Sequence, residues 1–163
     1  MAEFAVYTGQ CAAASFLDIA KAFDSVDHHF LVIQAVRHGF NLGVLRFLLA
    51  LYASQRIIEV VGVAAEPKRA IRSIVPGDSN ADLLMLLCLL SAVDKIQRIY
   101  PATHPALLAD DTQLLVVGTE QFCETTLADA TKMLIEDLEG VCLLEVSTEK
   151  LALVTSSPSL TKK

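Results

Sequence analysis

The sequence predicts an α+β fold, in which helices pack on one face of an antiparallel sheet. Short apolar segments alternate with helical segments in the order β, αα, ββ, α, ββ, α, ββ, and strands this short need shared sheet partners. Of the 163 residues, 53% are apolar and only 7 are Gly and 5 Pro, which is typical of a globular chain with a substantial core. We assign residues 1–155 to one domain and residues 156–163 to a polar tail.

Hydrophobic periodicity and turn residues place each element along the chain. The expected elements are a strand at 12–19, helices at 27–38 and 41–53, strands at 56–63 and 68–74 joined by a turn at 65–67, a helix at 80–98, short strands at 106–109 and 114–117, a helix at 120–138, and a closing pair of strands at 142–146 and 150–155. The helix at 120–138 has the clearest pattern, an apolar stripe of Cys123, Leu127, Ala130, Leu134 and Leu138.

Capping residues indicate where the helices begin and end. Asp27, Asn41 and Ser79 have short polar side chains that can accept hydrogen bonds from first-turn N–H groups. Gly39 and Gly140 stand where a helix can stop. The helix at 41–53 is apolar nearly all round, so we expect it to be buried.

Composition bounds the compartment and the partners. All four cysteines lie in apolar contexts without a CxxC motif, which favours buried free thiols in a reducing compartment. No signal peptide is evident, and the longest apolar run, 83–93, falls well short of the ~20 residues of a membrane span. We therefore expect a soluble intracellular protein of the cytoplasm or nucleus, with no membrane partner. The net charge of −6 argues against a generic nucleic-acid-binding module, but not against a metal-dependent site.

Two acidic positions stand at the ends of apolar strands. Asp110 and Asp111 lie on a predicted hairpin turn, where the pair either holds a divalent cation or is a solvated turn. Asp18 ends the first strand and must reach solvent, a cation or a metal, because burying it unpaired is costly. If these strands are neighbours the carboxylates converge, and a hard divalent cation would relieve their repulsion.

The polar residues around Asp18 have ordinary structural explanations. Asp24 is interpreted as a turn residue and Asp27 as a helix cap. His28 and His29 are adjacent, so they cannot both face one metal from a regular helix, and we interpret them as surface residues.

Four segments resemble motifs of reverse transcriptases, especially those of non-LTR retrotransposons and group II introns. They occur in the order of that family and cover almost the whole chain. FLDIAKAFDSVDHH (16–29) resembles the first catalytic motif, RSIVPGDSNADLLMLLCLL (72–90) the glycine-containing loop and long helix, LADDTQLLVVG (108–118) the paired-Asp hairpin, and VSTEKLALVTSS (146–157) the lysine motif. The resemblance implies a polymerase palm.

The resemblance also implies a set of site residues. Asp18 and Asp110 would be the principal ligands of Mg²⁺ or Mn²⁺, two ions in an intact site, with Asp111 as their acidic neighbour and the Ile19 carbonyl as a further ligand. Gly77 would let the backbone approach the nucleotide closely.

Two further residues keep an alternative interpretation. Phe23 either blocks the ribose 2′-hydroxyl, which selects deoxynucleotides, or packs in the core. Lys150 either approaches the triphosphate or is an ordinary solvated turn lysine.

The implied activity is RNA-directed DNA polymerisation, with an RNA template, a DNA primer and a dNTP as partners. The chain departs from the family pattern in its middle motif, where Ser73, Pro76, Ser79 and Asp82 replace Gly, Gln and two Pro, and at Leu108, which replaces an aromatic residue. Few residues precede the first motif, none of them Lys or Arg, and the fingers and thumb are largely absent. We therefore expect a partial, degenerate domain with little or no activity alone, unless another chain supplies the missing parts.

Two hypotheses from other classes stay open. The first is a non-catalytic α/β interaction module, or a retroelement remnant without polymerase activity, in which the exposed acids only aid solubility. The second, weaker one is another palm-type nucleotidyl transferase, such as a nucleotide cyclase.

Overall fold

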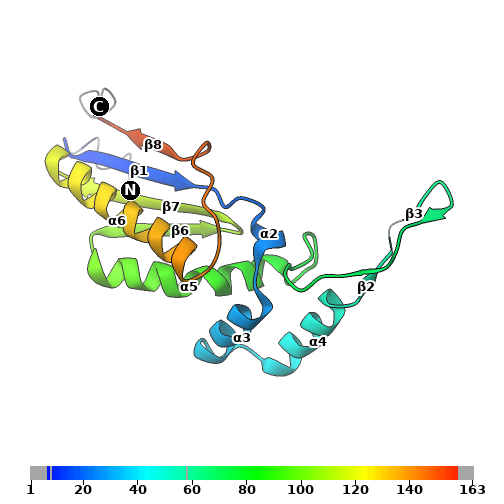
Figure 1. Cartoon of the computed structure of the whole chain (residues 1–163). Coiled ribbons are helices and arrows are strands. Elements are labelled where there is room, and N and C mark those ends of the chain that lie inside the picture. Colours follow the sequence, from blue (N-terminus) through cyan, green and yellow to red (C-terminus); the bar gives the residue numbers. More distant parts are fainter. Residues whose placement is uncertain (1–6, 8, 58, 158–163) are drawn as a thin grey trace.

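A four-stranded antiparallel sheet forms the centre of the molecule (Figure 1). The structure, a computed structural model, describes residue 7 and residues 9–57 and 59–157. The strands are β1 (Cys11–Leu17), β6 (Thr103–Leu108), β7 (Asp111–Gly118) and β8 (Ala152–Thr155), in the order β6-β7-β1-β8. Every neighbouring pair is antiparallel. The predicted α+β fold with an antiparallel sheet is confirmed.

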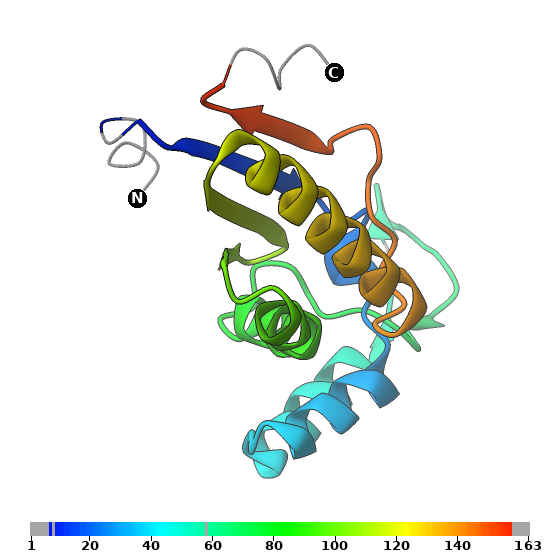
Figure 2. The ribbon, with the colours of Figure 1, turned by 90° about the vertical axis from the view of Figure 1, so that its left-hand side faces the viewer.

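Two long helices pack against the sheet (Figure 2). Helix α6 (Glu120–Gly140) contacts β1 and β7, and α5 (Ala81–Ile99) contacts β6 and α6. Along β7, Thr112, Leu114 and Val116 are buried, whereas the residues between them are partly exposed. This alternation is that of a strand with one covered face. The stripe predicted on α6 is confirmed, because its five residues, Cys123, Leu127, Ala130, Leu134 and Leu138, are all buried.

Two of the three predicted helix caps are confirmed. Asp27 precedes α3 (His28–Arg37) and accepts a hydrogen bond from the Phe30 N–H at 2.9 Å. Asn41 precedes α4 (Leu42–Tyr52) and accepts from Gly43 and Val44.

The cap predicted at Ser79 is wrong. Asn80 occupies the N-cap of α5 and makes no side-chain capping bond. The Asp78 carboxylate instead accepts the Asn80 N–H at 2.8 Å, so the acidic residue closes the preceding turn.

The expected burial of the whole of α4 is also wrong. Leu45, Leu48 and Tyr52 are buried, but Val44 and Leu51 are exposed and Phe47 has 68% of its surface exposed. These side chains are exposed because α4 lies at the edge of the molecule and packs mainly against α3 (Figure 1).

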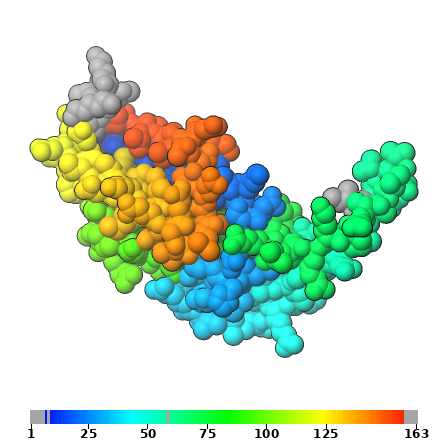
Figure 3. Space-filling model, in the orientation of Figure 1, coloured from blue at the N-terminus to red at the C-terminus, as the bar shows by residue number. Residues whose placement is uncertain are grey.

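The predicted hairpin at 56–74 is shorter and turns earlier than expected. Strand β2 (Gln55–Arg56) pairs with β5 (Lys68–Arg69), and β3 (Glu59–Val60) pairs with β4 (Val63–Ala64). The turn lies at Val61 and Gly62, both with positive φ, rather than at 65–67. Residues 55–57 and 59–69 belong to an arm that projects from the body (Figures 1 and 3).

Of the predicted closing pair of strands, the second is confirmed as β8 and the first is wrong. Residues 142–146 form no strand, because Leu143 has a φ of 58°, outside the extended range, and Leu144 N–H remains bonded to Leu138 O at the end of α6. Strand β8 pairs with β1 instead. Among the described helices, none is long and apolar enough to cross a membrane.

Candidate functional site

The pairing of β1 with β7 brings the two acidic positions to one edge of the sheet. Leu17, the last residue of β1, pairs with Thr112 near the start of β7. Asp18 follows Leu17, and Asp111 precedes Thr112, so the next position beyond the ladder is acidic on both strands. The strand that leads into Asp110, β6, is not the neighbour of β1 as the prediction required, because β7 lies between them. The acidic positions reach the same edge because β7, which begins at Asp111, pairs with β1.

The predicted acidic hairpin forms, but its strands are longer and its turn is tighter and begins one residue earlier than expected. Leu108 pairs with Asp111, which leaves Ala109 and Asp110 as a two-residue loop. Ala109 has a φ of 53°, a conformation that such tight loops require at their first residue. Asp110 is half-buried, and Asp111 is exposed and already part of β7.

Lys150 contacts the Asp18 carboxylate directly. Its Nζ donates a hydrogen bond to Asp18 Oδ2 at 2.9 Å. This bond, the charge of Asp18 and the charges of Asp110 and Asp111 raise the pKa of Lys150. The effect of all three carboxylates on one ammonium group places them in a common electrostatic environment.

Ile19 lies at a short bridge between the end of β1 and the segment after α6. Its side chain is buried, and its bridge partner is Val146. The hydrogen bonds of this bridge run from Ala20 N–H to Glu145 O and from Ser147 N–H to Asp18 O, both at 2.8 Å. They involve the neighbours of Ile19, so they do not occupy the Ile19 carbonyl.

Five of the predicted site residues line one hollow of about 420 Å³. They are Asp18, Ile19, Phe23, Asp110 and Lys150. Phe23 is half-buried. It lines the hollow, where it could contact a ribose, and it also packs against the core, so both interpretations of this residue stay open. Asp111 lines an adjoining hollow of about 450 Å³ that Asp18 and Lys150 share.

Gly77 lines neither of these hollows, although its neighbour Pro76 lines the first. Its φ of 84° explains the glycine, while nothing lies within 4 Å of where a Cβ would stand. The segment before it is tied to α2 (Ala22–Ser25) and its end, because Ile74 N–H bonds to Phe23 O at 2.8 Å and Ser73 N–H to Val26 O at 2.9 Å.

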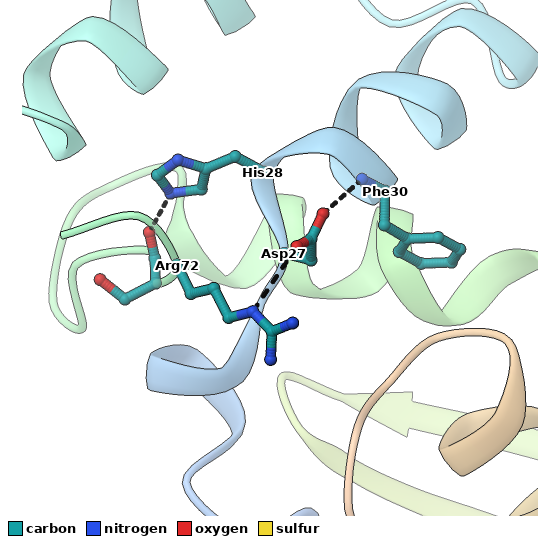
Figure 4. Close-up of polar contacts among 5 residues, drawn as sticks. Asp27, His28, Phe30 and Arg72 are labelled. Carbon is teal, nitrogen blue, oxygen red and sulfur yellow. Dashed lines mark hydrogen bonds and ion pairs between the residues drawn. The ribbon is translucent and has the colours of Figure 1, made fainter.

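The interpretation of His28 as a surface residue is wrong. It is half-buried, and its Nε2 lies 2.7 Å from the Ser73 carbonyl oxygen, so the Nε2–H donates this bond. Figure 4 shows this contact beside Asp27, which caps α3 and pairs with Arg72 at 3.6 Å. No spacing rule links residues 28 and 73, so the sequence held no signal for this contact. His29 is exposed, as predicted.

Tyr52 is fully buried near this site, although no motif of the sequence indicates a role for it. Burial and the neighbouring Asp78 carboxylate raise its pKa to about 12. Its hydroxyl is buried at the end of α4 without a hydrogen-bond partner among the described residues. The helical spacing of Tyr52 from Leu45 and Leu48, which are also buried, was the available signal.

The donor atoms at this edge of the sheet are of the type that binds a hard divalent cation. The Asp18 and Asp110 carboxylates and the Ile19 carbonyl are oxygen ligands, which Mg²⁺ and Mn²⁺ prefer. Within the described part of the chain, no three His, Cys, Asp or Glu side chains form a group that could hold a metal ion. A cation at this edge would therefore depend on backbone oxygen and water as well as on the two carboxylates.

Comparison with known proteins shows a likeness in fold to solved structures. No family model and no curated protein matches the chain. A solved structure of apo telomerase from Candida tropicalis, truncated from the C-terminal domain, superposes with a TM-score of 0.66 at 11% identity. The match covers 90% of this chain and 31% of that one. The chain shares a fold with part of a telomerase. It spans less than a third of the length of that protein.

Proposed function

We propose that the chain is the palm of a reverse-transcriptase-type polymerase, which adds deoxynucleotides to a primer 3′-hydroxyl. The observation that carries the proposal is the pairing of β1 with β7, which sets Asp18 beside the acidic hairpin with Lys150 at the same edge. Telomerase is itself a reverse-transcriptase-type polymerase. The likeness in fold adds support to that of the motifs, since at 11% identity it does not rest on shared sequence.

In this proposal the residues of the hollow have distinct roles. Asp18 and Asp110 hold Mg²⁺ or Mn²⁺, with Asp111 and the Ile19 carbonyl beside them. The metal, when bound, activates the 3′-hydroxyl and stabilises the leaving pyrophosphate. Phe23 forms the wall against which the sugar lies, and Lys150 supplies positive charge for the triphosphate.

The distribution of charge supports a nucleic-acid partner, an RNA template with a DNA primer. Residues 28–75 contain six Lys or Arg against two Glu, a net charge of +4. Residues 76–157 contain four against thirteen acidic residues, a net charge of −9. The overall charge of −6 therefore conceals a basic part, the helices α3 and α4 with the arm, that can contact phosphates.

Primer extension on an RNA template tests the proposal. The purified chain is incubated with dNTPs and either Mg²⁺ or Mn²⁺, beside Asp110→Asn, which keeps the side-chain shape but removes the charge. Because Leu108 and the altered middle motif depart from the family pattern, we expect weak extension in the wild type and none in Asp110→Asn. Extension that persists in Asp110→Asn would overturn the proposal, as would its absence together with an absence of metal binding.

A second candidate function is a non-catalytic interaction module. Two observations favour it: the Asp18 carboxylate is already paired with Lys150, and α4 exposes Val44, Phe47 and Leu51. Thermal unfolding with Mg²⁺ or Mn²⁺ distinguishes the candidates. A rise in melting temperature that is lost in Asp18→Ala supports the metal site, whereas no rise up to millimolar metal supports the interaction module.

A further inference from the structure

The turn that carries Lys150 is fixed to the residue that Lys150 contacts. Ser147 N–H donates to the Asp18 carbonyl at 2.8 Å, and Lys150 N–H donates to Ser147 O at 3.2 Å. The Lys150 backbone is thus held beside Asp18 by hydrogen bonds that do not involve the lysine side chain. The ammonium group can move while its backbone stays in place.

The two partners of this ion pair differ in their access to solvent. The Lys150 side chain is 67% exposed and the Asp18 side chain 22%. Lys150 also lines both hollows at the edge of the sheet. Its ammonium group can therefore leave the carboxylate for either hollow or for solvent without disturbing the core.

We propose that Lys150 is a placeholder for the divalent cation: it neutralises Asp18 in the metal-free chain and is displaced when a cation binds there. This inference rests on the proposed function, because it needs a cation at Asp18 and Asp110. An ammonium group 2.9 Å from Asp18 Oδ2 and a divalent cation on the same carboxylate repel each other, so they exclude one another.

Displacement links cation binding to the position of Lys150. While the lysine pairs with Asp18, it keeps the Asp18 carboxylate in position for a cation. It also reduces the repulsion between this carboxylate and that of Asp110. Once displaced, it remains beside the hollow, since its backbone is fixed through Ser147. There its charge faces the hollow that Phe23 and Asp110 line, where it can attract an anionic ligand.

The test is the affinity for Mn²⁺ without nucleotide, measured from the electron paramagnetic resonance signal of free Mn²⁺. Lys150→Met removes the charge and keeps the length of the side chain, and Lys150→Arg keeps the charge. Lys132→Met is the matched control, because Lys132 also forms an exposed ion pair, with Glu136 at 4.0 Å on α6. Since an exposed ion pair is weak, we expect Lys150→Met to bind Mn²⁺ about two- to fivefold more tightly than the wild type. Lys150→Arg and Lys132→Met should bind like the wild type.

A second measurement follows the lysine itself. The NMR signal of the Lys150 side chain, assigned by its loss in Lys150→Met, should shift toward that of a free lysine as Mg²⁺ is added. In Asp18→Asn the same signal should start near the free position and not respond.

The outcomes separate the inference from the proposed function. Tighter binding by Lys150→Met together with the NMR shift supports the placeholder. Binding by the wild type that Lys150→Met leaves unchanged or weakens overturns the placeholder and leaves the metal site standing. Absence of binding in both the wild type and Lys150→Met overturns the metal site, and the placeholder with it.

Discussion

Ser73 adopts a backbone conformation that glycine adopts most easily. Its φ is 106°, in the region that side chains disfavour, and its sequence position is one where the reverse-transcriptase motif has glycine. Two hydrogen bonds hold it there: its N–H donates to Val26 O, and its carbonyl accepts from His28 Nε2. The surrounding contacts thus maintain a strained residue in the segment that leads to Gly77.

Replacing Ser73 with glycine should stabilise the protein. Relief of the strain outweighs the conformational entropy that glycine adds to the unfolded chain, so we expect Ser73→Gly to raise the free energy of unfolding by about 1 kcal/mol. Urea unfolding measures the change. Ser79→Gly is the control, because Ser79 does not have a positive φ. The control should lower the free energy of unfolding, and the same sign for both variants would contradict the strain at Ser73.

Asp27 makes the stability depend on pH. Its hydrogen bond from the Phe30 N–H lowers its pKa most, and Arg72 lowers it further. Because the pKa is lower in the folded chain, the ionised group contributes stability above its unfolded value near 4, and this contribution disappears as the pH falls through the folded value.

Two variants at this position separate the capping bond from the charge. Asp27→Ala loses the cap and should lower the free energy of unfolding at pH 7 by about 1 kcal/mol. Asp27→Asn keeps an acceptor but loses the charge, so its deficit relative to the wild type should shrink as the pH falls below 4. Urea unfolding at several pH values measures both changes. A deficit of Asp27→Asn that is independent of pH would show that the charge contributes nothing.

At the scale of the elements, features that depend on spacing along one helix could be predicted from the sequence. Features that depend on which elements pack together could not. The stripe on α6 and the caps Asp27 and Asn41 follow from spacing along one helix, so the sequence was sufficient to predict them. The exposure of Phe47 depends on what lies beside α4, which hydrophobicity does not encode. Leu143 prevents the strand expected at 142–146 because its φ is positive, and a leucine in the sequence does not indicate such a conformation.

The candidate site also has features that the sequence predicted and features that it did not. Strand ends and turns are visible in the sequence, so the positions of Asp18 at a strand end and of Asp110 in a hairpin turn were predictable. Which strand neighbours β1 was not predictable: it is β7, which begins at Asp111, and not the strand that leads into Asp110. The contact of Lys150 with Asp18 was not predicted, since 132 positions separate them and only the fold fixes the distance.

Substitutions on α4 should reveal its one-sided packing. Leu48→Ala removes a buried side chain and should lower the free energy of unfolding by about 2–5 kcal/mol. Phe47→Ala, one residue away, removes a larger but exposed side chain and should change it by about 0.5 kcal/mol or less. Thermal or urea unfolding measures both. A loss in Phe47→Ala as large as that in Leu48→Ala would mean that the outer face of α4 is covered in solution.

At the scale of the whole molecule, the charge is divided between two parts of the fold. The basic residues concentrate in α3, α4 and the arm, and α6 carries most of its charge as Asp and Glu. On the arm, Arg56 pairs across the ladder with Lys68, and Arg69 stands next to it. Within the described part of the chain, neither Lys68 nor Arg69 has an acidic partner. Like charges opposed across a ladder destabilise it, and a polyanion would relieve that repulsion.

The arm should therefore provide salt-sensitive contacts to nucleic acid, independently of the metal site. Fluorescence anisotropy with a labelled single-stranded RNA, in EDTA and over a range of salt concentrations, measures this. The double variant Lys68→Gln/Arg69→Gln should bind more weakly, and the slope of log K against log salt should fall by about 1.4, since each phosphate contact to a single strand contributes about 0.7. Lys132→Gln on α6 removes a charge from the acidic part and should leave the slope unchanged. If Lys132→Gln loses as much affinity per charge removed, that is about half the loss of the double variant, net charge alone drives binding and the arm has no special part in it.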